Sequence, residues 1–527
     1  MVSSRHVLCL LPIGLALLLH LSLPVAARRS FPASTEESGV PEVSREFELD
    51  LNKLDGDRDN LMAQLKQLAS AHHTCGFDGE MQLMQLKLIN SSVTCNDGSP
   101  AGYYFRPSQG SKKWLIFLDG GFYCFDRDSC HNRRLTSGKL MSSRTWLKTK
   151  TGNGILSPDP EENPVFWKSN VVYLPYCSSD VWSGTATSSE TGGFSFMGAL
   201  ILNEVFKELM ETGLLDARQI VFAGSSAGGT GVLLNLDRVS AMLTEAGYTG
   251  QLLGLVDSGW FLDQEHQSLG SECTDTYYCN PSQALQLGTR LWRSSAPKSC
   301  VEMYGEENLW KCFFGFRIYE TLQTPVFLFQ WLYDEAQLTV GMSGPPIQMD
   351  HWNFMQKTGR DMRASLRNAS AIFAPACYAH MVLTKSDWTN IQVRSVRLHK
   401  ALQCWLKKNE PEEVTEKRGR KNKRRNNRRM SPEDLLSEGT RSRRSASRVK
   451  KRCQQRLLDH ATCPHCNPSC PKMKNPFTEE DMEFLSFMRL FGLDLGALAE
   501  QMGLDERTFS MLDPAEAMKR LAEAARN

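Results

Sequence analysis

The most informative part of the sequence for the fold is Gln219-Ile220-Val221-Phe222-Ala223-Gly224-Ser225-Ser226-Ala227-Gly228-Gly229. Its first half is apolar and predicts a buried strand. The small residues that follow allow a sharp turn, and the amphipathic segment Gly229–Ala246 predicts a helix directly after it. Strand, Gly-x-Ser-x-Gly turn and helix in this order are typical of a nucleophile elbow, with Ser226 at a helix N-terminus where the dipole favours developing negative charge. A glycine-rich turn that binds phosphate, or that binds nothing, is the alternative interpretation.

Similar apolar runs recur from about residue 75 to residue 405, and each ends in small or polar residues. They are Trp114–Leu118, Val171–Leu174, Leu252–Val256 and Pro325–Leu332. Amphipathic segments such as Phe194–Thr212 lie between them. Continuous apolar strands that alternate with helices predict βαβ units in a mainly parallel sheet. Together with the turn at Ser226, this pattern predicts the α/β class and, within it, an α/β-hydrolase fold.

A serine nucleophile needs a histidine base, which in this fold comes later in the chain. His380 ends the segment Phe373–His380, whose small residues and proline predict a tight loop that Cys377 can tether. We therefore predict that His380 is the base. His351, which follows a stretch rich in glycine and proline, is the competing candidate.

The acid that orients the histidine is expected at the end of a late strand. Asp334 follows the β-like run Pro325–Leu332, whereas Asp257 ends the earlier run Leu252–Val256. We favour Asp334, because one more strand separates it from the nucleophile. Its carboxylate would hold the tautomer of His380 and stabilise the imidazolium that forms. Asp257 stays open as the alternative.

An oxyanion hole needs backbone N–H donors close to the nucleophile. One donor is the residue after the serine, Ala227. A second is expected from a glycine-rich loop after an early strand, and Gly120-Gly121-Phe122 follows the run Trp114–Leu118. Gly121 and Phe122 are therefore the candidate donors, and an ordinary Gly-Gly turn is the alternative.

Beyond these residues, several longer motifs resemble the secreted carboxylesterases of the pectin-acetylesterase-like family over roughly residues 75–405 and 460–471. The motifs are Gly120–Cys124, Phe222–Gly231, Asp257–Phe261, Cys312–Gly315, Gln330–Val340 and Phe373–Cys377. The resemblance implies that the family's catalytic triad falls on Ser226, Asp334 and His380, and it favours Asp334 over Asp257. It implies no cofactor and no metal.

The resemblance also implies a substrate. Secreted members with these motifs remove a palmitoleate ester from a serine of Wnt proteins and so silence Wnt signalling, whereas plant members are sugar O-acetyl esterases. A lipid acyl chain needs an apolar pocket beside the nucleophile. By the resemblance, the residues that would line it are Tyr123, Phe261, Phe313, Phe314, Ala336 and Val340. One departure is Phe122, which stands where the family has tryptophan and would alter the pocket wall.

The N-terminal sequence and the cysteines predict a secreted protein. Residues 1–27 have a basic residue (Arg5), an apolar run and the small-residue exit Val25-Ala26-Ala27, as in a cleaved signal peptide. Fifteen of the 16 cysteines remain after its removal, a number typical of an oxidising compartment and one that leaves at least one cysteine without an intrachain partner. Sequons at Asn90 and Asn368 predict glycosylation. No later run approaches the ~20 apolar residues of a membrane span.

Charge is concentrated in one segment. The whole chain carries +2, but residues 417–452 contain 16 Lys/Arg and 3 Asp/Glu. We interpret residues 411–452 as a disordered basic insertion. A solvated segment without a partner is one interpretation. The charge would also suit heparan sulfate, which the family resemblance places on glypicans. Proteolysis at the furin-like sites Arg441–Arg444 or Arg448–Arg452 is the other functional interpretation. The secretory signal excludes nuclear targeting, and we expect no nucleic-acid partner.

Cysteines gather again after the insertion, at Cys453, Cys463, Cys466 and Cys470. With His460 and His465 they could form a zinc cluster, but in a secreted chain disulfides are the favoured interpretation.

The predicted organisation is a signal peptide (1–27), a flexible lead-in (28–70), a catalytic domain (71–410), the basic insertion (411–452) and a Cys-rich patch with a helical C-terminal segment (453–527). A lipid-ester hydrolase acting on Wnt is the first functional hypothesis, and a sugar O-acetyl esterase, as in the plant members, is the second. A non-enzymatic heparan-sulfate-binding protein on a hydrolase scaffold is the third.

Overall fold

The computed structural model of the chain describes residues 83–264, 279–342, 349–410 and 453–475, together with Cys273, Thr276 and, with gaps, residues 478–520. The predicted signal peptide, lead-in and basic insertion lie outside these residues. Among the helices that the structure does describe, none is long and apolar enough to cross a membrane.

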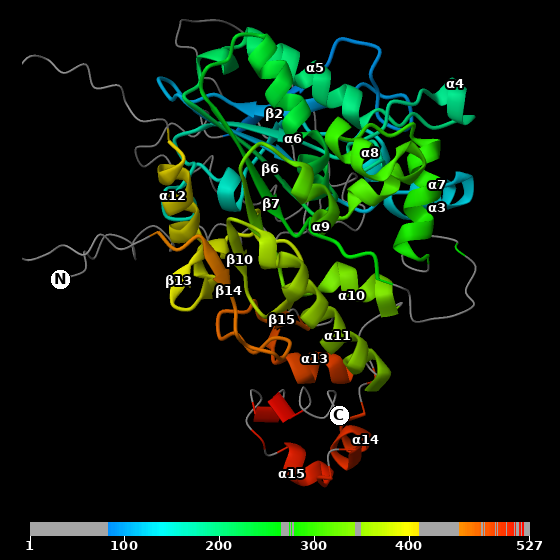
Figure 1. The fold of residues 1–527 in the computed structure, drawn as a ribbon, viewed down its shortest axis with the longest axis vertical. Coiled ribbons are helices and arrows are strands. Elements are labelled where there is room, and N and C mark those ends of the chain that lie inside the picture. The colour runs from blue at the N-terminus through cyan, green and yellow to red at the C-terminus, as the bar shows by residue number, and fades with distance from the viewer. Residues whose placement is uncertain are drawn as a thin grey trace, which may run out of the picture. The chain divides into compact units, whose positions relative to one another are not determined.

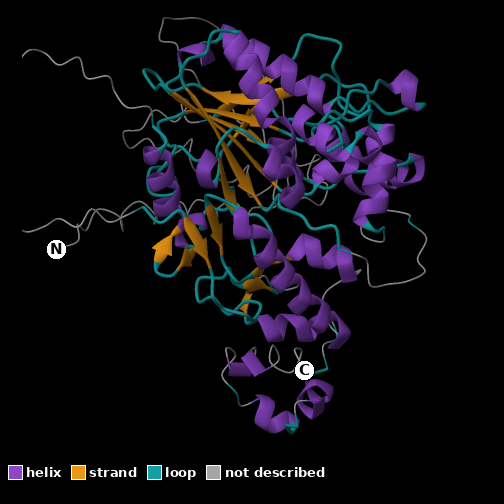
Figure 2. Cartoon of the chain, in the orientation of Figure 1, coloured by secondary structure: helices purple, strands orange, loops and turns teal. Residues whose placement is uncertain are grey.

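The centre of the protein is a ten-stranded sheet, which Figure 2 shows in orange with helices around it. Six neighbouring pairs in it are parallel, and three pairs at one edge are antiparallel. The prediction of an α/β fold with a mainly parallel sheet is confirmed. In spatial order the strands are β14 (Arg456–Leu458), β10 (Ile372–Ala374), β8 (Val326–Phe329), β7 (Gln251–Asp257), β6 (Gln219–Ser225), β3 (Lys113–Leu118), β5 (Asn170–Leu174), β2 (Gly102–Arg106), β1 (Met84–Leu88) and β4 (Thr149–Lys150).

Both faces of the sheet are buried, which is why its strands are continuous apolar runs. Along β6, Ile220 and Phe222 belong to one hydrophobic core, whereas Val221 and Ala223 belong to the other. Helices α5 (Gly198–Glu211) and α6 (Ala227–Glu245) contribute to the first core, and α12 (Leu398–Lys408) contributes to the second. Figure 1 shows α6 close to β6 and β7.

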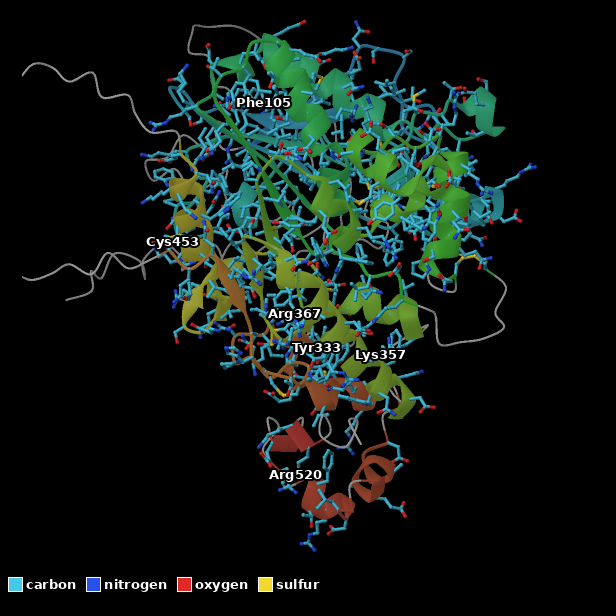
Figure 3. The ribbon with its side chains drawn as sticks, viewed as in Figure 1. Phe105, Tyr333, Lys357, Arg367, Cys453 and Arg520 are labelled. Carbon is cyan, nitrogen blue, oxygen red and sulfur yellow. A yellow bond between two sulfur atoms is a disulfide. The ribbon has the colours of Figure 1, made fainter. Side chains whose placement is uncertain are left out.

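All five predicted strand runs form strands, namely β3, β5, β6, β7 and β8. The run predicted as Pro325–Leu332 is a strand only over Val326–Phe329, so Asp334 does not directly extend it. Asp334 lies instead in a separate short strand, β9 (Tyr333–Asp334), which pairs in parallel with β11 (Tyr378–Ala379). Tyr333, labelled in Figure 3, marks this place.

The remaining described elements lie outside the ten-stranded sheet. The helices are α3 (Arg127–Ser137), α4 (Ser188–Thr191), α7 (Pro281–Leu291), α8 (Lys298–Tyr304), α9 (Gly315–Ile318), α10 (Glu335–Met342), α11 (Met349–Ser365), α13 (Phe484–Leu490), α14 (Leu495–Gln501) and α15 (Glu506–Ser510). Two further hairpins are β12 (Gln392–Val393) with β13 (Val396–Arg397), and β15 (Met473–Lys474) with β16 (Asp481–Met482).

The sheet includes a strand from beyond residue 452. Strand β14 pairs in parallel with β10, and the disulfide Cys404–Cys453 joins the segment just before it to α12. Figure 3 labels Cys453 at this point. The disulfides Cys377–Cys470 and Cys463–Cys466 complete the Cys-rich patch. All four of its cysteines are therefore in disulfides, as predicted.

Seven disulfides are present, and they account for fourteen of the 16 cysteines. The other two, Cys9 and Cys75, lie outside the described residues. No group of three or more His, Cys, Asp and Glu side chains in the described part of the chain is arranged to hold a metal ion.

Candidate active site

Ser226 occupies the turn between β6 and α6 in a conformation that few residues adopt. Its φ is 56° and its ψ is −125°, a region that is unfavourable for any residue with a side chain. The two flanking glycines make the turn possible. A Cβ atom on Gly224 would lie 2.4 Å from the carbonyl oxygen of Gly228, and one on Gly228 would lie 2.3 Å from that of Leu118. The sharp turn lifts the Ser226 hydroxyl out of the sheet at the start of α6.

The structure brings Ser226, His380 and Asp334 into one hydrogen-bonded line. His380 Nε2 lies 2.8 Å from Ser226 Oγ, and His380 Nδ1 lies 3.0 Å from Asp334 Oδ2. The last contact follows from the pairing of β9 with β11, in which Asp334 is opposite Ala379, the residue before the histidine. The hydroxyl, imidazole and carboxylate are thus arranged as a nucleophile, its base and the group that orients the base.

The charge balance around His380 favours its protonated form. Burial alone would lower the pKa of His380, but the carboxylate of Asp334, through its charge and its hydrogen bond, raises that pKa above the ordinary value of 6.5. The Asp334 side chain is fully buried and also accepts from Gln330 Nε2 (3.1 Å) and from the backbone N–H of Gln337 (3.2 Å). These donors satisfy the carboxylate and fix it in place for the histidine.

The predicted oxyanion loop lies directly against the nucleophile. A Cβ atom on Gly120 would be 2.8 Å from Ser226 Cβ and 3.2 Å from the Ala227 nitrogen, so only glycine permits this approach. Phe122 has a φ of 53° and, with Ala227, lines the cavity that Ser226 opens into. Gly121 is not among the residues that line the cavity, and its carbonyl oxygen accepts from Arg133 Nη2 at 2.5 Å.

A cavity opens beside Ser226. All six residues predicted to form an apolar pocket line it, although they come from four separate parts of the sequence. They are Tyr123, Phe261, Phe313, Phe314, Ala336 and Val340.

Two polar side chains that line the cavity, Thr230 and Gln337, are already hydrogen-bonded within the protein. Thr230 Oγ1 donates to the carbonyl oxygen of Gly259 at 3.1 Å, and Gln337 Oε1 accepts from the backbone N–H of Leu262 at 2.8 Å. These groups do not need a polar ligand to satisfy them. The cavity therefore suits an apolar group attached to a carbonyl at Ser226.

Sequence reasoning missed part of the cavity wall. The additional lining residues are Val181, Thr230, Leu262, Thr276, Pro281, Leu285 and Gln337. Their positions follow from tertiary packing, and the sequence had no periodic signal for them. Val181 is held at a φ of 55°, unusual for a β-branched residue, in a turn whose backbone N–H groups bond to the buried carboxylate of Asp180.

The competing candidates lie elsewhere. His351 is in the first turn of α11. The histidine that contacts Ser226 Oγ is His380, not His351. Asp257 is buried near the site, but its carboxylate bonds to Ser225 and to the backbone after His380. The sequon residues Asn90 and Asn368 both have exposed side chains.

The sheet has a serine at a strained turn, and this serine is hydrogen-bonded in line with a histidine and an aspartate beside an apolar cavity. Together these features define a serine hydrolase of the α/β class. The sequence model of the pectinacetylesterase family matches residues 77–471. The chain belongs to this family, as the resemblance of its motifs predicted.

Named relatives are similar over nearly the whole chain. The palmitoleoyl-protein carboxylesterase NOTUM of Mus musculus is 43% identical, over 89% of this chain and 88% of its own. The Homo sapiens protein of the same name is 44% identical over 87% of each chain. The Drosophila melanogaster protein of that name is 32% identical over 96% of each chain.

Proposed function

We propose that this protein is a secreted carboxylesterase that removes the palmitoleate ester from a serine of Wnt proteins and so inhibits Wnt signalling. The observation that carries the proposal is the largely apolar cavity beside the Ser226 hydroxyl. The names of relatives that are 43–44% identical, palmitoleoyl-protein carboxylesterases, support the same substrate class.

In the proposed mechanism, His380 Nε2 takes the proton of Ser226 Oγ as the oxygen attacks the ester carbonyl. The backbone N–H groups of Ala227 and of Gly121 or Phe122 stabilise the oxyanion of the tetrahedral intermediate. When this intermediate collapses, the bond from the carbonyl carbon to the substrate serine oxygen breaks, and His380 gives its proton to that oxygen, which leaves as the serine hydroxyl of the substrate protein. The acyl group is then bound as an ester to Ser226.

Deacylation uses the same groups. His380 takes a proton from water as the water attacks the acyl-enzyme carbonyl, and the proton then passes to Ser226 Oγ as palmitoleic acid leaves. Throughout, Asp334 holds the Nδ1–H tautomer of His380 and stabilises the imidazolium. The chemistry needs no cofactor.

The cavity wall and the loop that contains Phe122 together form the proposed acyl site. The hydrocarbon chain would lie along Phe261, Phe313 and Val340 while its carbonyl stays at Ser226. Phe122 lines the same cavity. Because the family has tryptophan at this position, phenylalanine changes the side chain in the cavity wall but leaves the backbone N–H donor in place. We expect it to tune the acyl chain length that is preferred.

The test compares wild type and Ser226→Ala on p-nitrophenyl octanoate and p-nitrophenyl acetate, and then on a palmitoleoylated Wnt peptide. We expect wild type to prefer the octanoyl ester and to release palmitoleate from the peptide, and Ser226→Ala to do neither. Hydrolysis of acetate alone would instead indicate a sugar O-acetyl esterase. No hydrolysis of any ester would leave only the non-enzymatic hypothesis.

We further propose that the protein is glycosylated at Asn90 and Asn368 and is retained at the cell surface by heparan sulfate on glypicans. Both asparagines are exposed, which a glycan requires. The excess of Lys/Arg in residues 417–452 is the basis for the heparan sulfate partner. Deletion of residues 417–452 is expected to abolish salt-sensitive retention on a heparin column, and unchanged retention would refute that role.

A further inference from the structure

We propose that Asp257 is a positioning residue that holds the His380 loop against the nucleophile elbow. This inference rests on the proposed function of the same site and assigns a role to a carboxylate outside the triad. Asp257 ends β7, directly opposite Ser225 in the register with β6, and is fully buried. Its described hydrogen bonds do not include one to the His380 ring, although its negative charge adds to that of Asp334 in raising the pKa of His380.

On one side, Asp257 is bonded to the elbow. Its Oδ2 accepts from Ser225 Oγ at 2.6 Å, and its backbone carbonyl oxygen accepts from the N–H of Ser226 at 2.8 Å. These two bonds hold the residue before the nucleophile and the nucleophile itself. The side chain of Ser225 points into the protein, away from the cavity where Ser226 is exposed to substrate.

On the other side, the same carboxylate is bonded to the backbone that follows the base. Asp257 Oδ2 accepts from the N–H of Val382 at 2.9 Å and from that of Leu383 at 3.0 Å. Its Oδ1 accepts from Ser258 Oγ at 2.9 Å, and that hydroxyl oxygen in turn accepts from the N–H of Met381 at 3.0 Å. Three consecutive N–H groups after His380 are thus held by Asp257 and its neighbour.

The loop needs such an anchor because its conformation is unfavourable. Met381 has a φ of 54° and Ser258 has a φ of 51°, which residues with side chains rarely adopt. Before His380, the pairing of β11 with β9 fixes the chain, and after His380 the Asp257 bonds fix it. The imidazole is therefore held from both directions at 2.8 Å from Ser226 Oγ.

The experiment measures kcat and KM on p-nitrophenyl octanoate for Asp257→Ala and Asp257→Asn, with active sites counted by a fluorophosphonate. In Asp257→Ala we expect kcat to fall about 100-fold, because a displacement of about 1 Å at a catalytic group has that effect. KM is expected to change little. Asp257→Asn is expected to recover most of the loss, because its amide oxygen still accepts from both N–H groups.

Asp237 provides a matched control. Its carboxylate also accepts from two consecutive N–H groups, those of Gln323 (2.9 Å) and Thr324 (3.0 Å), in the loop before β8. Asp237→Ala therefore removes an equivalent loop anchor outside the site, and we expect lower stability with unchanged kcat. If Asp257→Ala does not fold, Ser258→Ala, which removes the acceptor of the Met381 N–H, is expected to lower kcat in the same way.

A crystal structure of Asp257→Ala, or of Ser258→Ala if only that variant folds, tests the geometry independently of esterase activity. We expect His380 Nε2 to move beyond hydrogen-bond distance of Ser226 Oγ. An unchanged distance would overturn the inference, even if the wild-type protein hydrolysed no ester. So would an Asp257→Ala variant with wild-type kcat, or an Asp257→Asn variant as impaired as Asp257→Ala, which would indicate a role for the charge.

Discussion

Val340→Trp should convert the enzyme from a long-chain to a short-chain esterase. Val340 lies on α10 and lines the cavity beside Ser226, where its side chain is 9% exposed. An octanoyl chain has six more methylenes than an acetyl group. At about 0.8 kcal/mol for each buried methylene, an apolar cavity can favour octanoate by up to about 5 kcal/mol, or about 3,000-fold in kcat/KM. An indole in the cavity removes the space that this preference needs.

The assay is the ratio of kcat/KM for p-nitrophenyl octanoate to that for p-nitrophenyl acetate. We expect the ratio to fall by at least about 100-fold in Val340→Trp, while acetate hydrolysis stays within about threefold of wild type because the triad is untouched. Acetate hydrolysis in the same sample is the control for folding. A variant that keeps both the wild-type ratio and its acetate activity would refute the assignment of this cavity to the acyl chain.

Three further predictions concern the triad and its support. Asp334→Asn should lower kcat by about 10⁴-fold on the octanoyl ester with little change in KM, since the wrong tautomer of His380 is then favoured; a loss of less than tenfold would exclude Asp334 as the acid. Because Asp334 raises the pKa of His380 above 6.5 and the base must be neutral, kcat/KM should fall on acidification with a midpoint above pH 6.5, and a midpoint clearly below it would contradict the geometry. The double variant Cys377→Ser, Cys470→Ser should lose about 2–5 kcal/mol of unfolding free energy in urea, since this disulfide closes a loop over a separation of 93 residues; an unchanged midpoint would show that β11 does not depend on the tether.

Local signals in the sequence were sufficient for the elbow. The strand, the turn and the helix around Ser226 are contiguous, and each is specified by residues within a few positions of it. Gly224 and Gly228 are needed because any side chain there would meet backbone within 2.4 Å. The five apolar strand runs were predictable for a similar reason, because strands buried on both faces have no polar positions.

The choice between Asp257 and Asp334 was not local. Both follow apolar strands, and from the residues alone both remained candidates. The pairing of β9 with β11 places Asp334 beside the histidine, whereas Asp257 meets the backbone three residues further on. The run Pro325–Leu332 was also predicted too long, because β8 ends at Phe329. Beyond that residue only single backbone bonds continue, from the N–H groups of Gln330 and Leu332 to the carbonyl oxygens of Phe373 and Pro375.

Local sequence patterns were sufficient for the α/β sheet and the serine at a sharp turn, and the family resemblance supplied the residues of the apolar pocket and favoured Asp334 as the acid. The tertiary structure then showed the hydrogen bond between Asp334 and His380, added further residues to the cavity wall, and revealed that a strand from beyond residue 452 completes the sheet. The difference between the two groups of features is their separation along the chain. A turn is fixed by its own residues. The hydrogen bond between Ser226 and His380 instead joins residues 154 positions apart, so it depends on how the intervening strands pack.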